Sequence, residues 1–197
     1  KLQGKTFTVA LWENGGDTTT KGVYAQEEKL KITYNTPAVN YNPILEKIMM
    51  GSQSDGGMRF NVSIPQGASI RSAKIIFTAF PDLLNNSAAT TLLIKGEASD
   101  NASQYLTSGA GGTANFTGRG KTTALTNWSI NAPWNSGSQY STPDISSIVQ
   151  EVVNRAGWVS GNNMAFYLSD NNSATGSMRI AYSFDANPKL APILQVT

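Results

Sequence analysis

The sequence predicts an all-β fold, an antiparallel β-sandwich of the jelly-roll type with one short amphipathic helix. Two observations support this prediction. Short runs rich in β-branched and aromatic residues recur along the chain, separated by polar turns that contain Gly, Pro and Asn. Only one segment, at 143–156, has apolar residues at helical spacing. A series of strands with a single helix is typical of a sandwich or a jelly roll.

The predicted strands follow from alternation and from strand-forming residues. A further run at 44–50 fits either a strand or one helical turn, because periodicity does not separate the two for so short a segment. The segment 100–118, with two adjacent glycines at its centre, is predicted to be a loop. The expected strands are 6–12, 22–25, 30–34, 58–62, 70–80, 90–97, 122–130, 164–168, 178–184 and 192–196.

The predicted helix has a start signal and a stop signal. Thr142 is expected to cap the first N–H groups, Pro143 to occupy the first turn, and Asp144 to complement the helix dipole. Gly157 is expected to end the helix in a left-handed conformation, and Trp158 is expected to fold back onto Val153 of the helix. The expected buried face comprises Ile145, Ile148, Val149, Val152 and Ala156, and the expected outer face Ser147, Gln150, Glu151 and Asn154.

Composition excludes several classes of function. The 197 residues contain no Cys and no His, which rules out disulfides, thiolate metal sites and a serine–histidine relay. Charged residues make up 14% and the net charge is +2, too little to indicate a nucleic-acid partner. No apolar stretch has the ~18 residues of a membrane span. The remaining chemistry is that of carboxylates, Lys, Tyr or a metal bound by oxygen.

Several sequence blocks occur in a characteristic order: 59–70, 72–73, 118–119, Trp128, 133–134, 142–145, 150–155, 157–158, 160–162, 181–185 and 191–194. This ordered set resembles the non-catalytic jelly-roll modules of large secreted bacterial proteins, which are similar to carbohydrate-binding modules. The resemblance covers 58–197 and implies a β-sandwich and an extracellular setting. Residues 1–57 lack the acidic, serine-rich opening of those modules; they are expected to form strands of the same sandwich or an assembly arm.

Aromatic residues are the first candidates for ligand contact, because a flat ring packs against the apolar face of a sugar. Trp134 and Tyr140 lie in the turn-rich segment before the helix and are the candidates we select, although packing under the helix is an alternative for both. Trp128 and Trp158 are expected in the core. Arg119, in one of the blocks above, is the third candidate for ligand contact.

Oxygen-bearing residues after a predicted strand are candidate ligands for Ca²⁺, which takes 6–8 oxygens. They are Glu97, Asp100 and Asn101, with 170–172 as a second group. The alternative is that these Asp and Asn residues cap turns. No spacing indicates the pair of carboxyl groups that a glycosidase needs, so we predict that the chain is not an enzyme and has no required cofactor.

The sequence therefore favours a non-catalytic extracellular module that binds glycans or a neighbouring protein surface through its loops. The alternative is a structural subunit, either a virion decoration or fibre protein or a subunit of an extracellular filament. Oligomers or larger assemblies are expected under that alternative. The expected location is extracellular, at the cell surface, or in a virion.

Overall fold

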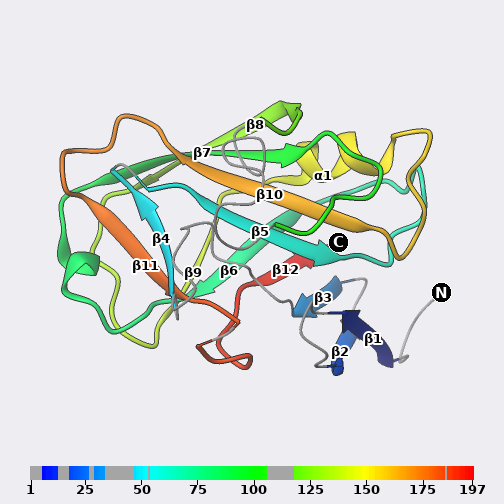
Figure 1. Cartoon of the computed structure of the whole chain (residues 1–197), viewed down its shortest axis with the longest axis horizontal. Helices are drawn as coiled ribbons and strands as arrows, with labels where there is room; N and C mark the ends of the chain where they lie inside the picture. Colours follow the sequence, from blue (N-terminus) through cyan, green and yellow to red (C-terminus); the bar gives the residue numbers. More distant parts are fainter. Residues whose placement is uncertain are drawn as a thin grey trace.

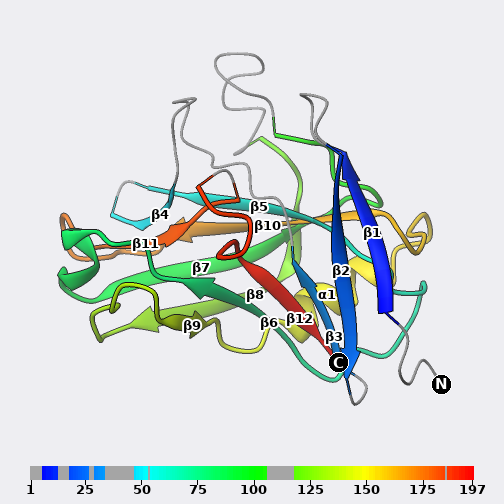
Figure 2. The same ribbon diagram turned by 90° about the horizontal axis from the view of Figure 1, so that it is seen from below.

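The computed structural model describes residues 47–52, 54–105, 118–184 and 186–197, together with the backbone of three N-terminal strands. The predicted fold class is confirmed: antiparallel sheets pack as an all-β sandwich with one short α-helix. Figure 2 shows the two layers, with β5 and β10 in the upper layer and β6 and β9 in the lower one. In the described part of the chain, no helix has the length and apolar character that a bilayer crossing requires.

One sheet has six strands in the order β1-β2-β3-β12-β6-β9, and every pairing in it is antiparallel. β3 pairs with the C-terminal strand β12, so the three N-terminal strands extend the same sheet as the C-terminus. Figure 1 shows them beside β12. The bounds are β1 Thr6–Trp12, β2 Thr18–Gln26, β3 Lys29–Thr33, β12 Ile193–Val196, β6 Ala73–Thr78 and β9 Gln139–Ser141.

The second sheet has the order β5-β10-β7-β8, and a two-stranded sheet pairs β11 with β4. A bridge between Ala79 and Ala181 joins β11 to the end of β6. A 3₁₀ turn, η1 (Leu83–Asn86), lies between β6 and β7. The bounds are β5 Gly56–Asn61, β10 Asn163–Asp170, β7 Thr90–Glu97, β8 Lys121–Ile130, β11 Met178–Tyr182 and β4 Lys47–Gly51.

Most predicted strands are present, although several bounds differ; β2, for example, begins at Thr18 rather than at residue 22. The ambiguous run before residue 51 forms strand β4. β6 is shorter than the predicted 70–80, because Ile70 and Ser72 lie before its pairing with β12. β9 was not predicted, since its three residues show no alternation of their own and are ordered by pairing with β6. Part of the predicted loop, 106–117, lies outside the described residues, and so does the segment 34–46 between β3 and β4.

The helix α1 (Ser146–Val153) begins later and ends earlier than predicted. Thr142 does not cap it, because the Thr142 Oγ1 accepts from the Ile75 N–H and the Thr142 N–H donates to the Ile75 carbonyl. Asp144 instead accepts a backbone hydrogen bond from Ala73 and a longer one, at 3.4 Å, from the Ser146 N–H. The residues expected to open the helix are therefore bonded to strand β6.

The C-terminal end of α1 also differs from the prediction. Gly157 is not among the glycines with positive φ, and Ala156 is exposed because the helix has already ended. The side chain of Gln66 donates to the carbonyls of Arg155 and Ala156, the last turn after the helix. The Gly67 N–H donates to the Val153 carbonyl as well, so a distant loop rather than a left-handed glycine satisfies carbonyl groups at this end of the helix.

The polar side of α1 is bound to its neighbours. The Glu151 carboxylate accepts the N–H groups of Thr123 and Ala124 on β8, at 2.9 and 2.7 Å. Gln150 accepts from the Ile70 N–H and donates to the Ala68 carbonyl. Because these contacts fix the loop before β6 and the edge of β8, α1 closes one end of the sandwich.

The main core lies between the sheets and includes the predicted inward face of β6. Two aromatic rings contributed by opposite sheets, Phe77 and Trp128, stack at 5.9 Å between centroids. Trp158 is buried, as predicted, and its Nε1 donates to the Ile64 carbonyl. The fully buried Arg179 donates from Nη2 to the carbonyls of Ile130 and Ala132, and so links β11 to the end of β8.

Candidate functional site

Strand β10 is buried on both faces, which creates a second, smaller cluster outside the sandwich core. Met164, Phe166 and Leu168 belong to the main core. Ala165 and Tyr167 point the other way and pack with Ala102 and Tyr105, from the segment that follows β7. The outer face of the β5-β10-β7-β8 sheet is therefore covered in part by residues 102–105.

A carboxylate, a guanidinium and a phenol meet in this cluster. Arg119 Nη1 lies 3.1 Å from Glu97 Oε2, and the Tyr167 hydroxyl donates to the same oxygen at 2.9 Å. Glu97 ends β7 just after an irregularity in its pairing with β8, a feature that commonly redirects a side chain. The structure thus brings together Glu97 and Arg119, which the sequence placed in different candidate sites.

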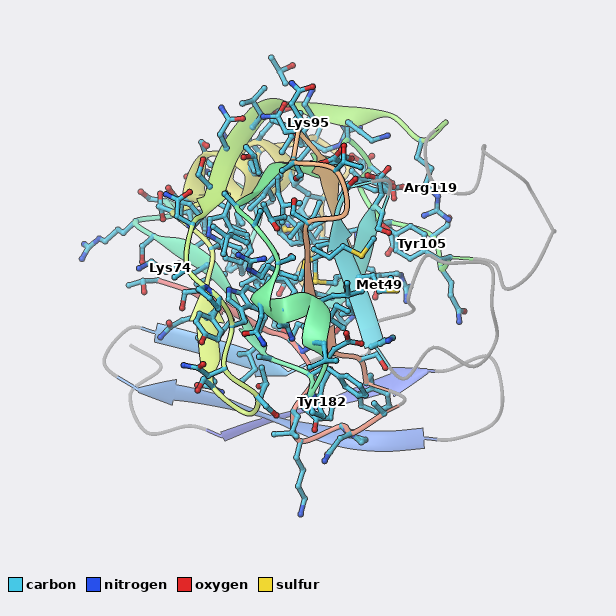
Figure 3. The ribbon with its side chains drawn as sticks, turned by 90° about the vertical axis from the view of Figure 1, so that its left-hand side faces the viewer. Met49, Lys74, Lys95, Tyr105, Arg119 and Tyr182 are labelled. Atoms are coloured by element: carbon cyan, nitrogen blue, oxygen red, sulfur yellow. The ribbon has the colours of Figure 1, made fainter. Side chains whose placement is uncertain are left out.

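Arg119 also holds the covering segment in place. Its Nη1 donates to the Ser103 carbonyl at 2.7 Å and its Nη2 to the Gln104 carbonyl at 2.8 Å. The guanidinium lies over the Tyr105 ring, 4.7 Å from its centroid. Figure 3 shows Arg119 beside Tyr105, on the opposite side of the molecule from Lys74. Arg119 therefore fixes the segment 103–105 against the sheet, in addition to placing a positive charge near the surface.

Two further cations border this cluster. Arg59, on β5, donates from Nε to the Ala102 carbonyl at 2.8 Å. Among the described residues, neither Nη atom of Arg59 has an acceptor and no carboxylate pairs with it. Lys121 on β8 lies over the Tyr167 ring, 4.6 Å from its centroid. We call Arg59, Arg119 and Lys121, with the tyrosines beneath them, the basic cluster.

Two of these cations, Arg59 and Lys121, have pKa values below their ordinary range. Burial lowers the pKa of Arg59, and the neighbouring Arg119 lowers it further, against the opposing effect of Glu97. Burial and the nearby Lys95 lower the pKa of Lys121. Burial also raises the pKa values of Tyr105 and Tyr167, so both phenols stay neutral at physiological pH. The site is therefore suited to a group that brings negative charge.

The aromatic candidates for ligand contact lie elsewhere. Trp134 is 2% exposed, and Tyr140 stacks on it in parallel at 4.7 Å between centroids. Phe77 and Trp128 pack against Trp134 as well. Trp134 therefore has no ring face to offer a sugar, which corrects its selection as a ligand contact. The half-buried Tyr140 accepts the Asn135 N–H at its hydroxyl, and Trp134 covers one face of its ring.

The candidate calcium ligands each have a different protein partner. Glu97 bonds Arg119 and Tyr167, Asp100 pairs with Arg155 at 2.6 Å, and Asn101 accepts the backbone and side-chain N–H groups of Asn163. Within the described part of the chain, no group of three or more acidic side chains is arranged to hold a metal ion. Calcium binding at these residues stays a prediction that the geometry does not favour.

The second candidate metal group has the turn-capping role given as its alternative. Asp170 Oδ1 accepts the Ser173 N–H, and Asn171 donates to the Asn127 side chain. Asn172 has a φ of 59°, the left-handed conformation that Asn tolerates in turns. These contacts shape the connection between β10 and β11.

Several residues of the basic cluster were not selected from the sequence, although one signal was present. Arg59 interrupts the apolar run around Met58 and Phe60, and alternation alone would place it on the face opposite the core. Tyr167 sits in a continuous apolar run that hides its outward position. Tyr105 follows β7 and Lys121 begins β8, and no local pattern reveals that both lie beside Tyr167.

Comparison with known proteins leaves the family open. No family model matches the chain, and no curated protein matches it. Among solved structures, a protein of desmodium yellow mottle tymovirus is 8% identical, with 86% of this chain and 85% of that chain covered and a TM-score of 0.28. A thermostable cellulase derived from Cel12A of Rhodothermus marinus is 9% identical, with coverages of 90% and 89% and a TM-score of 0.25.

A third structure, of the Gx strain of infectious bursal disease virus, is 11% identical with a TM-score of 0.22. It is matched over 97% of this chain but only 53% of that one. TM-scores this low do not establish a shared fold. The assignment to the all-β sandwich class therefore rests on the sheets of this chain. Its function must likewise be inferred from its own side chains.

Proposed function

We propose that this chain is a non-catalytic extracellular module that binds glycans or a neighbouring protein surface through its basic cluster. The observation that carries the proposal is Arg59. Its guanidinium is half-buried beside a second arginine, and no ion-pair partner among the described residues compensates it. Holding like charges together in a partly desolvated place is unfavourable, and a bound anionic group relieves that cost.

The carboxylates support a non-catalytic role. A glycosidase needs two carboxyl groups across a cleft, one of them with a raised pKa. Every carboxylate on the fully described residues accepts a hydrogen bond from the protein, and Asp82 and Asp144 have lowered pKa values. These groups are Asp55, Asp82, Glu97, Asp100, Asp144, Glu151 and Asp170.

The charge of the site indicates the preferred partner. The sequence of 106–117, the continuation of the covering segment, contains no Asp or Glu and cannot supply the missing negative charge. A glycan that carries carboxylate or sulfate groups would bind Arg59 bidentately through its two Nη atoms. Neutral glycans lack this contact, so we expect acidic glycans to bind more tightly.

A glycan array with neutral, carboxylated and sulfated members tests this function. Binding is expected for acidic members, and added salt should weaken it because the contact is partly exposed. Arg59→Gln should reduce affinity about tenfold or more, the usual effect of losing a charged hydrogen bond. Lys74→Gln removes the same charge from an exposed position on the other side of the molecule and should have no effect.

The second candidate function is a structural subunit of a virion or an extracellular filament. The observation that favours it is the long N-terminal edge strand of the six-stranded sheet. A blank glycan array together with ordered self-assembly would support the subunit. Acidic-glycan binding that Arg59→Gln abolishes and Lys74→Gln preserves would support the module.

A further inference from the structure

We infer that strand β1 is an assembly edge that pairs antiparallel with β1 of a second copy of this chain. β1 lies at the end of the six-stranded sheet and, of the described strands, pairs only with β2, over all seven of its residues. Figure 2 shows β1 as the outermost strand beside β2. One row of backbone N–H and C=O groups in β1 therefore faces away from β2.

β1 carries none of the features that protect natural sheet edges. Its residues are Thr6, Phe7, Thr8, Val9, Ala10, Leu11 and Trp12, with no charge, no Pro and no Gly. Charges, prolines, short length and covering helices are the usual protection against edge-to-edge pairing. A long, uncharged, strand-forming edge without them is a site for pairing with another chain.

The other edges of the two larger sheets do carry such protection. β9 has only three residues. β8 bears Lys121, and the Glu151 carboxylate of α1 occupies two of its N–H groups. β5 has two glycines and Arg59. Of the edges of the two larger sheets, β1 is therefore the one whose own sequence brings no charge against an added strand.

A second copy fits this edge because β1 is self-complementary. In an antiparallel pair with two-fold symmetry centred on Val9, Phe7 faces Leu11 of the second copy and Thr8 faces its Ala10. Each position then meets an uncharged partner, and the interface is isologous, as in most homodimers. The two sheets join into one continuous sheet. This inference is independent of the basic cluster.

Cysteine trapping tests the register, since the chain has no cysteine of its own. Val9→Cys places two thiols opposite each other on the two-fold axis, and mild oxidation should convert it to a covalent dimer. Thr6→Cys is the matched control, because in this register the two copies of residue 6 are about 20 Å apart. A mixture of Phe7→Cys and Leu11→Cys proteins should give the mixed dimer.

Sedimentation analysis of the unmodified chain supplies a measurement that does not depend on any variant. A monomer–dimer equilibrium is expected, and Val9→Lys, which opposes two like charges, should weaken it at least tenfold while Val9→Thr preserves it. The inference is overturned if the unmodified chain is monomeric at every concentration, or if Thr6→Cys and Val9→Cys form disulfides at the same rate.

Discussion

Gly157 and Asp100 approach so closely that no side chain fits between them. A Cβ on Gly157 would lie 2.7 Å from the Asp100 Cγ, well inside the distance at which real Cβ atoms contact their neighbours. Asp100 is held there by its ion pair with Arg155, at 2.6 Å. The glycine after α1 is therefore needed for the approach of a carboxylate rather than for a left-handed turn.

This relationship predicts that the effect of Gly157→Ala on the free energy of unfolding depends on whether residue 100 is Asp or Ala. Gly157→Ala should destabilise the fold by about 1 kcal/mol, because Asp100 must turn away and lose a partly exposed ion pair. In an Asp100→Ala background the same change should be neutral or stabilising by up to about 1 kcal/mol, since alanine restricts the unfolded chain. Urea unfolding of the four proteins measures this coupling, and simple additivity would contradict it.

Trp134 is predicted to determine stability rather than ligand affinity. Trp134→Ala should cost about 3–5 kcal/mol, because the cavity would remove the support of Phe77 and Tyr140. Trp134→Phe should cost less, since it keeps a ring against Tyr140. Thermal unfolding measures both. If Trp134→Ala melted like the unmodified protein and lost glycan binding, its placement in the core would be contradicted.

Arg179 should not tolerate lysine. Its Nη1 donates to Ser87, Ala88 and Thr90, while its Nη2 serves two carbonyls at the end of β8. A lysine ammonium has three donors on one atom and cannot reach both groups, which leaves buried acceptors unsatisfied. Arg179→Lys should therefore cost about 3 kcal/mol or more in denaturant unfolding.

The matched control for this substitution is Arg71→Lys, at an exposed position. It should change the free energy of unfolding by no more than about 0.5 kcal/mol. Equal effects of the two substitutions would show that the guanidinium geometry of Arg179 is not required.

Stability should fall in acid partly through Asp82. The Lys47 ammonium donates to Asp82 Oδ2 at 2.7 Å and lowers the pKa of this carboxyl, with the Leu84 N–H acting in the same direction and burial opposing them. Because the folded-state pKa is lowered, the ionised Asp82 stabilises the fold at pH values above the ordinary pKa of 3.8. This stabilisation is lost as the pH falls through the folded-state pKa.

Unfolding free energies of the unmodified protein and Asp82→Asn test this dependence. We expect a difference of about 1 kcal/mol at neutral pH that shrinks towards zero as the pH falls below 3.8 and through the lowered folded-state pKa of Asp82. A difference that stays constant with pH would show that the ion pair does not contribute in this way.

The sequence by itself determined most of the strands and the buried face of β6. Alternation in β6 placed Ala73, Ile75 and Phe77 on the core side, and all three are buried. The apolar spacing of α1 likewise predicted most of its buried face. Such patterns succeed because a strand repeats every two residues and a helix every 3.6, so the choice of face is local.

Only the tertiary structure decided the ends of the helix and the composition of the site. Thr142 was a good local cap, but its bonds with Ile75 on β6 replaced that role. Glu97 and Arg119, separated by 22 positions, met because the chain returns to the same end of the sheet. Arg59 joined them from strand β5. Hydrogen bonds and charges act between groups close in space, and chain topology sets that closeness.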